Sequence, residues 1–579
     1  MLIRFGPAQR EDFLGRVRRQ GLDEELAARE AERLSLAIGA TLPAAAGVDV
    51  ARTLLNKIAG YNVDMHGWVI RAMRAMGAAD NLLNGAGRLE FELPDLLLGE
   101  YFLLEYARSR GVRVATVAAW DGLVASMIGR MKPRCETEAY EPVEVDLTAH
   151  TLPEPSQRWH DARQVGAVFV ASMTNYLRPL LPVMERLIQA GRRAVLLTPG
   201  TVASDAGIPD GVEIVPLEAP PGSAVASVRE MVAQSVSLAW RGRAAACKAA
   251  CRLGGVSLWP LVCRDVEHMA RVYVPYAAAC DEAVRTVLAR TRAPTLVVAR
   301  LRRATELSAA MAARDMGVRI VMIPHGHIGE RPTRRFIDGE FALADCVAVW
   351  GPHQRERARS RGARAISETG NPAWDSLATS LPDRVAARRA MAAGLGLPES
   401  APWFCIASQP EASTQLRAVC GVLLDVPGCC VLIRPHPAEA PDDCRGLCET
   451  YPDRVRLVRD APLSTLLAAC DACLTHHSTV NLESLLCGTP VVTCAFGALR
   501  GVDRLLNLEE FGLPIAFDAK ELETVAREVA ADPGTFVGRY RASIRRALDA
   551  TLANHSDGGA AVRLIGLLDR TSRAWAVAA

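Results

Sequence analysis

The chain has 579 residues, half of them hydrophobic. Because a single hydrophobic core rarely serves more than about 300 residues, this length predicts two or three domains. The 67 basic residues nearly balance the 65 acidic ones, for a formal net charge of +2. That balance excludes a global field that would attract nucleic acid or an anionic membrane.

The first 155 residues differ from the rest because helical patterns dominate them. Residues 24–38 and 61–83 repeat apolar side chains at helical spacing, whereas only residues 113–119 resemble a strand. Residues 138–159 are rich in proline and polar side chains, which is typical of a linker. We therefore expect residues 1–155 to form a mainly helical accessory region that ends in a linker.

The cellular location and the partners of the protein are predicted from sequence features that are not found. It shows no basic leader followed by an apolar stretch of signal-peptide length, and no uninterrupted apolar run of about 18 residues. The sequence thus predicts a cytoplasmic protein and leaves open peripheral contact with the inner membrane or an assembly complex. Arginine clusters at 302–303, 331–335 and 355–364 lack interleaved aromatic residues for base stacking, so we expect no nucleic-acid partner.

The 16 cysteines are scattered, and most lie inside apolar runs. This is typical of reduced, buried thiols. Cys470 and Cys473 form a C-x-x-C pair that we expect on a helix, without a good second pair and histidine at zinc-finger spacing. We therefore expect no metal ion and no cofactor.

From residue 160 onward, strand and helix patterns alternate. Residues 165–172 and 192–199 are apolar strand patterns that flank an amphipathic helix pattern closed by a glycine. The alternation continues to about residue 375 and is repeated over 376–579. It predicts an α/β fold with an N-terminal Rossmann-like domain over 160–375 and a C-terminal one over 376–579, facing each other across a cleft.

Two predicted strands end in proline-bracketed or glycine-flanked histidines. Residues 320–323 lead into Pro324, His325, Gly326 and His327, and residues 431–433 lead into the R-P-H-P motif at 434–437. Proline stiffens these loops, and ligands of open α/β sheets bind at strand ends. An imidazole there can hold a phosphate, although a solvent-facing loop histidine is the simpler alternative, especially for His327.

A polar turn begins the predicted helix within L-T-H-H-S-T-V-N-L-E-S-L-L-C-G-T-P-V-V, residues 474–492. Ser478 or Thr479 starts the helix, so a hydroxyl and free N–H groups meet at its positive end. Glu483 is four residues beyond Thr479 and shares its face of the helix. This arrangement predicts a phosphate at the turn and a ribose hydroxyl on the carboxylate, or else an ordinary capped helix.

In the order PHG, ADCVAVWG, TGNPAWDSL, RPHP and HHSTVNLESLLCGTPVV, these motifs resemble the bacterial GT-B glycosyltransferases of surface and capsule polysaccharide synthesis. The nearest groups are capsule transferases with an HP motif, such as polysialyl- and Kdo-transferases. The CDP-glycerol glycerophosphotransferases and the non-hydrolysing UDP-N-acetylglucosamine 2-epimerases are similar in outline. The resemblance covers residues from about 160 to about 570.

The resemblance implies transfer of a sugar from a nucleotide-activated donor to a glycan or lipid-linked glycan acceptor, without a metal ion. It implies that His436 holds the donor phosphate, that Ser478 and Thr479 complete this phosphate site, and that Glu483 binds the donor ribose. Arg434 would add positive charge, and Ser408 and Gln409 would line the same pocket.

The resemblance is incomplete, because the acidic base motif of the HP-type sialyltransferases is not evident in the first domain. Candidates for the base that accepts the acceptor proton are His325, ranked first, with Asp338 and Glu340. Thr174 and Asn175, after the first strand of that domain, are expected to contact the acceptor.

Two other functions remain open. A UDP-sugar 2-epimerase or hydrolase would use the same fold, but the loop at 324–330 departs from the epimerase H-x-E-A-G pattern, since Gly326 precedes His327 and the acid comes at Glu330. A non-catalytic scaffold for polysaccharide assembly would not require the R-P-H-P and Ser-Thr-Glu residues.

Overall fold

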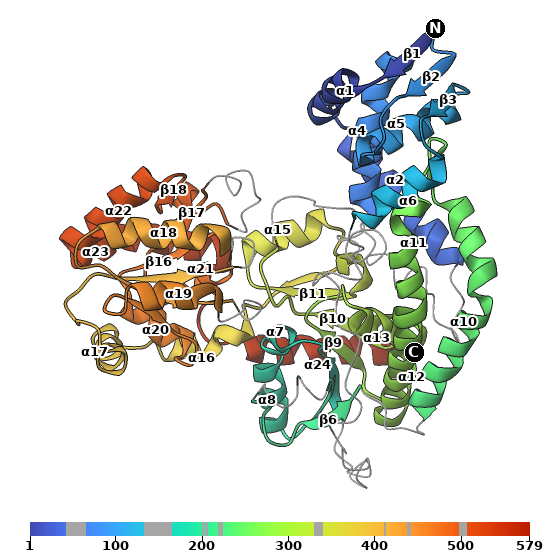
Figure 1. The fold of residues 1–579 in the computed structure, drawn as a ribbon. Helices are drawn as coiled ribbons and strands as arrows, with labels where there is room; N and C mark the ends of the chain where they lie inside the picture. Colours follow the sequence, from blue (N-terminus) through green and yellow to red (C-terminus); the bar gives the residue numbers. More distant parts are fainter. Residues whose placement is uncertain are drawn as a thin grey trace. The chain divides into compact units, whose positions relative to one another are not determined.

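The computed structural model describes residues 1–41, 65–131, 165–199, 202, 207–217, 224–328, 340–409, 413–436, 442–476, 478–496 and 506–578. The chain forms two compact units. Unit 1 consists of Met1–Leu177, Gly191–Val321 and Thr333–Asp345, and unit 2 consists of Arg178–Ala190, Met322–Pro332 and Cys346–Ala579. The elements are labelled in Figure 1.

The N-terminal part contains a small parallel sheet in addition to the expected helices. Its strand order is β1-β2-β3, with β1 Leu2–Phe5, β2 Arg88–Phe91 and β3 Arg113–Thr116. The sequence predicted only the third strand, which lies in the longer apolar pattern of residues 113–119. The patterns around β1 and β2 are too short for a strand to be recognised. The helices are α1 Pro7–Arg19, α2 Glu24–Thr41, α4 Met65–Leu83, α5 Leu98–Ser109 and α6 Trp120–Gly129.

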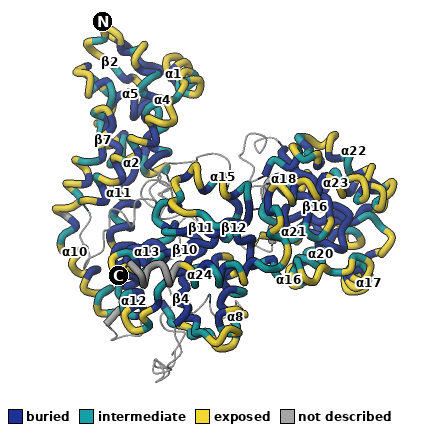
Figure 2. The backbone as a smooth tube through the Cα atoms, turned by 180° about the vertical axis from the view of Figure 1, so that it is seen from behind, coloured by how far each residue is buried: buried dark blue, intermediate teal, exposed yellow. Residues whose placement is uncertain are grey.

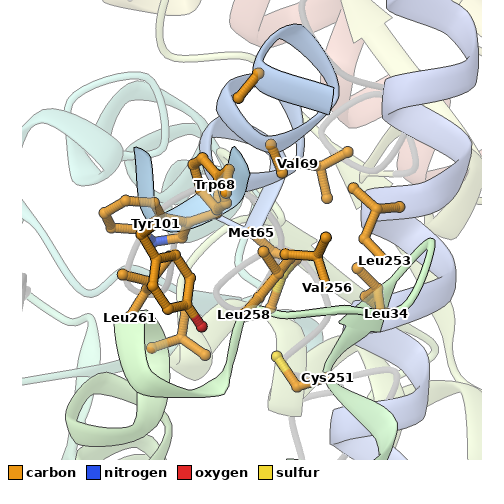
Figure 3. Close-up of a cluster of buried hydrophobic side chains, with 14 of the residues drawn as sticks. Leu34, Met65, Trp68, Val69, Tyr101, Cys251, Leu253, Val256, Leu258 and Leu261 are labelled. Atoms are coloured by element: carbon orange, nitrogen blue, oxygen red, sulfur yellow. The ribbon is translucent and has the colours of Figure 1, made fainter. Parts of the chain in front are cut away.

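This part shares one hydrophobic core with a later segment of unit 1. Figure 3 shows Trp68 and Tyr101 packed with Leu258 and Leu261, and the same cluster continues through α10 and η4. The accessory region and the helices after residue 224 are therefore one packing unit, which the expected boundary near residue 155 does not reflect. The later elements are α10 Ala224–Ala250, β7 Arg252–Leu253, β8 Val256–Ser257, α11 Trp259–His268, the π-helix η4 Met269–Tyr273 and α12 Val274–Thr291.

A seven-stranded sheet has the order β12-β11-β10-β9-β4-β5-β6. All six residues of β4 are buried, as expected for a parallel strand covered on both faces, and the buried strands are dark blue in Figure 2. The strands are β4 Val165–Val170, β5 Arg193–Thr198, β6 Glu213–Pro216, β9 Thr295–Val298, β10 Arg319–Met322, β11 Cys346–Val349 and β12 Ile366–Glu368. Their helices are α7 Thr174–Leu177, α8 Leu181–Gln189, α13 Ala304–Asp315 and α15 Pro352–Ser360.

A six-stranded parallel sheet in unit 2 has the order β15-β14-β13-β16-β17-β18. Its strands are β13 Trp403–Ala407, β14 Cys430–Arg434, β15 Val455–Leu457, β16 Ala472–Thr475, β17 Val491–Cys494 and β18 Ile515–Ala516. The helices of unit 2 after β12 are η5 Pro372–Trp374, α16 Asp375–Thr379, α17 Arg384–Leu395, α18 Ser413–Asp425, α19 Asp442–Thr450, α20 Leu463–Ala469, α21 Val480–Leu486, η8 Leu508–Phe511, α22 Ala519–Ala531, α23 Pro533–Leu552 and α24 Ala560–Ala578.

Each large sheet is doubly wound, so each has a point where the strand order reverses. In the six-stranded sheet the chain proceeds outward from β13 to β15 and, in the other direction, from β16 to β18, so the reversal lies between β13 and β16. In the seven-stranded sheet the same reversal lies between β4 and β9. The predicted α/β class with two Rossmann-like sheets is confirmed, and ligands of such sheets bind at these reversals.

None of the described helices is long and apolar enough to cross a membrane.

Gly370, in the turn that follows β12, has a conformation that other residues rarely adopt. Its φ is +82°, and a Cβ atom would lie 2.7 Å from the carbonyl oxygen of His555. The next residue, Asn371, accepts a hydrogen bond from the N–H of Ala373 and so begins η5. The G-N-P turn therefore requires glycine both for its backbone angle and for the close approach of the chain near α24.

We expect Gly370→Ala to lower the free energy of unfolding by about 1–3 kcal/mol, because it adds left-handed strain and a steric clash. Urea denaturation would measure this loss. The control is Gly421→Ala, inside α18, where an added Cβ has no neighbour within 4 Å, so helix propensity predicts a gain of about 0.5–1 kcal/mol. Equal effects of the two substitutions would contradict the assignment.

Candidate functional site

A pocket lies at the reversal of the six-stranded sheet, at the carboxyl ends of β13 and β16. It encloses ≈ 400 Å³ of empty space, its open mouth included. The walls are mostly apolar, with a few polar side chains at strand ends, which is the composition of small-molecule sites. The polar lining residues are Ser408, Gln409, Gln415, Thr475 and His476.

The sequence predicted Ser408 and Gln409 in this pocket but not His476 or Gln415. Ser408 continues β13 and donates its N–H to the carbonyl of Arg434 at 3.0 Å. His476 is buried, and its Nδ1 lies 3.1 Å from the carbonyl oxygen of Cys494. Because a carbonyl can only accept, the ring proton is assigned to Nδ1. The sequence feature that could have indicated His476 as a pocket residue is its position directly after the buried strand β16.

Glu483 of the predicted set accepts hydrogen bonds from side chains of two distant segments. It is buried on α21, and its Oε1 accepts hydrogen bonds from Arg178 Nη2 at 2.6 Å and from Trp374 Nε1 at 2.9 Å. Its Oε2 is buried and has no hydrogen-bond partner among the described residues. One carboxylate therefore joins three segments of unit 2, and the sequence indicated neither Arg178 nor Trp374 as its partner.

The predicted turn forms at the start of α21. Thr479 is the N-cap, and the Ser478 hydroxyl accepts from the N–H of Val480 at 3.3 Å. The helix ends before Gly488, whose φ is +76°. The prediction of a Ser-Thr start and a glycine end is therefore confirmed.

The Pro324–His327 loop lies beside this turn. A Cβ atom on Gly326 would lie 4.0 Å from Thr479 Cγ2, so the two motifs approach each other within unit 2. The loop is held by Trp350, whose Nε1 donates to Pro324 O at 3.0 Å. His327 is buried and stacks on His353 with ring centroids 4.8 Å apart. His325 is half-buried between these anchored residues.

The two predicted residues of the R-P-H-P motif are placed differently from each other. His436 is exposed beyond the end of β14. Arg434 directs Nη1 to the carbonyls of Val458 at 3.2 Å and Ala461 at 3.1 Å, and also to that of Arg459. These carbonyls follow β15, on the side of β14 away from β16. The structure thus uses this guanidinium to hold the loop after β15.

The reversal of the seven-stranded sheet carries a second buried polar group in unit 1. Glu306, in the first turn of α13, is fully buried and accepts the N–H of Ser172 at 2.7 Å. Burial raises the pKa of its carboxyl group. Burial also raises the pKa of Tyr176 on α7, and the charge of Glu306 adds to that shift. Glu306 thus ties α13 to the loop after β4, and sequence reasoning missed it.

Glu340, a predicted base, is fully buried beside two arginines of unit 1. Its Oε1 lies 3.2 Å from Arg302 Nε and 3.5 Å from Arg300 Nη1. Thr174 and Asn175, the predicted acceptor contacts, are exposed at the start of α7. Asp338 lies outside the described residues. The structure brings the loop of His325 towards the Ser478–Thr479 turn, whereas it places Glu340 in an ion-pair cluster.

The prediction that the cysteine pair lies on a helix is wrong, because α20 ends at Ala469 and Cys473 belongs to β16. Cys405 packs against both thiols, and hydrogen bonding to them raises the pKa of Cys405. Within the described ranges, no three histidine, cysteine, aspartate or glutamate side chains come together as metal ligands.

Comparisons with known proteins add the following. No family model matches the chain, and no curated protein matches it. The UDP-GlcNAc 2-epimerase of Methanocaldococcus jannaschii is 10% identical with a TM-score of 0.45, over 69% of this chain and 99% of that one. The wall teichoic acid polymerase TagF is 13% identical with a TM-score of 0.45, over 72% of this chain and 91% of that one. A glycosyltransferase from Rickettsia africae is 9% identical with a TM-score of 0.45, over 71% of this chain and 99% of that one.

The raised pKa of Glu306 predicts a pH-dependent stability. Its ordinary value is 4.5, so between that pH and its higher folded-state pKa the folded protein binds a proton that the unfolded chain has lost. Wild-type stability therefore falls as pH rises through this interval. Glu306→Gln cannot ionise, and its amide oxygen can still accept the hydrogen bond from the N–H of Ser172. The melting temperature of this variant, relative to that of the wild type, should therefore increase as pH rises.

Thermal unfolding at pH 4, 5.5 and 7 measures this difference. Glu185→Gln, on an exposed residue of α8, is the matched control. A difference between Glu306→Gln and the wild type that does not change with pH would contradict the prediction.

Proposed function

We propose that the protein is a metal-independent glycosyltransferase that moves a sugar from a nucleotide-activated donor to a cell-surface glycan or lipid-linked glycan. The observation that carries this proposal is the group of segments around Glu483. Arg178 and Trp374 donate to it, and the Ser478–Thr479 turn begins its helix. The Pro324–His327 loop approaches this turn at Thr479. The pocket at the reversal of the same sheet lies at strand ends, where ligands of open α/β sheets bind.

In this proposal the donor's nucleoside occupies the pocket lined by Ser408, Gln409 and His476. Its phosphates bind at Ser478 and Thr479 with His436 nearby, and a ribose hydroxyl donates to Glu483. Hydroxyl and N–H groups, rather than a metal ion, stabilise the negative charge of the leaving phosphate.

The transfer step needs one base and one leaving group. The acceptor hydroxyl oxygen bonds to the anomeric carbon of the sugar while the bond from that carbon to the donor phosphate oxygen breaks. The nucleotide leaves with that bond's electron pair, and the hydroxyl proton passes to a base. We assign this base to His325, because its loop lies beside Thr479. Thr174 and Asn175 are assigned to the acceptor.

The first test is thermal unfolding in CMP, CDP, UDP and GDP. A nucleotide at 100 times its dissociation constant should stabilise the folded protein by about 2.7 kcal/mol. We expect one nucleotide to raise the melting temperature and His436→Ala to lose that rise. The control is His555→Ala, whose ring in unit 2 lies 3.4 Å from Glu368 and which should keep the full shift.

Transfer itself is tested with the matching nucleotide-sugar and a glycan acceptor. His325→Ala should lower turnover by about 10²–10⁴-fold while nucleotide stabilisation persists, because a base acts on the proton and not on donor binding. No stabilisation by any of the four nucleotides would contradict the proposal, as would nucleotide release without sugar on the acceptor.

A further inference from the structure

Arg178 forms an ion pair with Glu483, and no motif in the sequence indicated it. Its Nη2 donates to Glu483 Oε1 at 2.6 Å, across 305 positions of sequence. The two partners differ in environment, because the Arg178 side chain is 56% exposed and the Glu483 side chain is 5% exposed. The pair thus joins a solvated, movable guanidinium to a fixed, buried carboxylate.

Trp374 keeps the carboxylate in place independently of Arg178. Its indole N–H donates to the same Oε1 at 2.9 Å, and its ring is buried against Trp350 with centroids 4.7 Å apart. The indole cannot leave without disturbing this packing. Arg178 can leave Glu483 more easily, because its side chain is 56% exposed and water can solvate the guanidinium when it turns away.

Arg178 also has N–H donors that the bond to Glu483 does not use. A guanidinium carries five N–H groups in a planar fork that matches phosphate oxygens. Among the described residues, Glu483 is the single hydrogen-bond partner of Arg178. By contrast, Arg434 donates to three carbonyls on the β15 side of the sheet. Of these two arginines, Arg178 is therefore the one whose fork can reach an anion beside Thr479 and Glu483.

We propose, on the basis of the donor-binding function proposed above, that Arg178 binds the diphosphate of the donor. In the unliganded protein its guanidinium lies on Glu483. When the donor enters, the guanidinium turns to the phosphate oxygens, and Glu483 Oε1 becomes available to a ribose hydroxyl. Arg178 is thus both a phosphate ligand and an exchangeable partner of the ribose-binding carboxylate.

Calorimetric titration with inorganic pyrophosphate tests this assignment without a nucleoside. We expect Arg178→Gln to weaken pyrophosphate binding by about 10–100-fold, the usual range for a lost charge-assisted contact. Glu483→Gln should strengthen it, because the competing carboxylate is gone. Arg186→Gln is the matched control, since this exposed arginine of α8 donates to Gln189 at 2.9 Å.

A second titration compares the stabilising nucleoside diphosphate with its nucleoside. Arg178→Gln should weaken the diphosphate by the same factor and leave the nucleoside unchanged, whereas Arg186→Gln should change neither. Thermal unfolding of each variant checks folding. If Arg178→Gln is unfolded, Arg178→Lys replaces it, and we expect a smaller loss because the charge remains but the fork is absent.

The two proposals fail in different ways. Pyrophosphate binding that is absent in the wild type, or equal in the wild type and Arg178→Gln, overturns the role of Arg178 whatever the nucleotides do. Pyrophosphate binding that depends on Arg178 in a protein that binds no nucleotide supports the anion site and overturns the glycosyltransferase.

Discussion

Glu483 accepts hydrogen bonds from both Arg178 and Trp374, and through them one buried carboxylate connects parts of the chain that are 305 and 109 positions apart. Removing a carboxylate from water is costly unless donors surround it. The segments after α7 and β12 and the helix α21 are therefore constrained together. The same requirement keeps a buried charged group on α21, one turn from Thr479.

The doubly wound sheets explain why polar residues meet at these places. A strand buried on both faces accepts almost no polar side chains, so β4 and β13 are apolar throughout, and β16 is apolar until Thr475 at its end. Polar residues begin where each strand ends, and the reversal of strand order separates the two loops that follow neighbouring strands. Ser172 and Glu306 meet in this way in one sheet, and Ser408 and His476 line one pocket in the other.

The buried charges of the two sheets are balanced differently. Glu483 has an exposed arginine as its partner, whereas Glu340 has Arg300 and Arg302, which are buried or half-buried. Glu306 has a backbone N–H instead, and burial raises the pKa of its carboxyl group. The exposure of the partner decides how easily a ligand can replace it, so the Glu483 pair is the one suited to exchange.

The sequence alone determined the alternation of apolar strands and helices, the turn at Ser478 and Thr479, and the clustering of polar residues at strand ends. These depend on neighbouring residues: apolar runs, a cap four residues from a carboxylate, and proline beside histidine. It could not indicate the partners of Glu483, because nothing near residue 483 specifies Arg178 or Trp374. It missed β1 and β2, because neither lies in an apolar pattern as long as the one at 113–119 that contains β3. It also missed the core that residues 1–131 share with 228–278. Long-range pairing of this kind is decided by burial in three dimensions, where buried side chains select their partners by shape and hydrogen bonding.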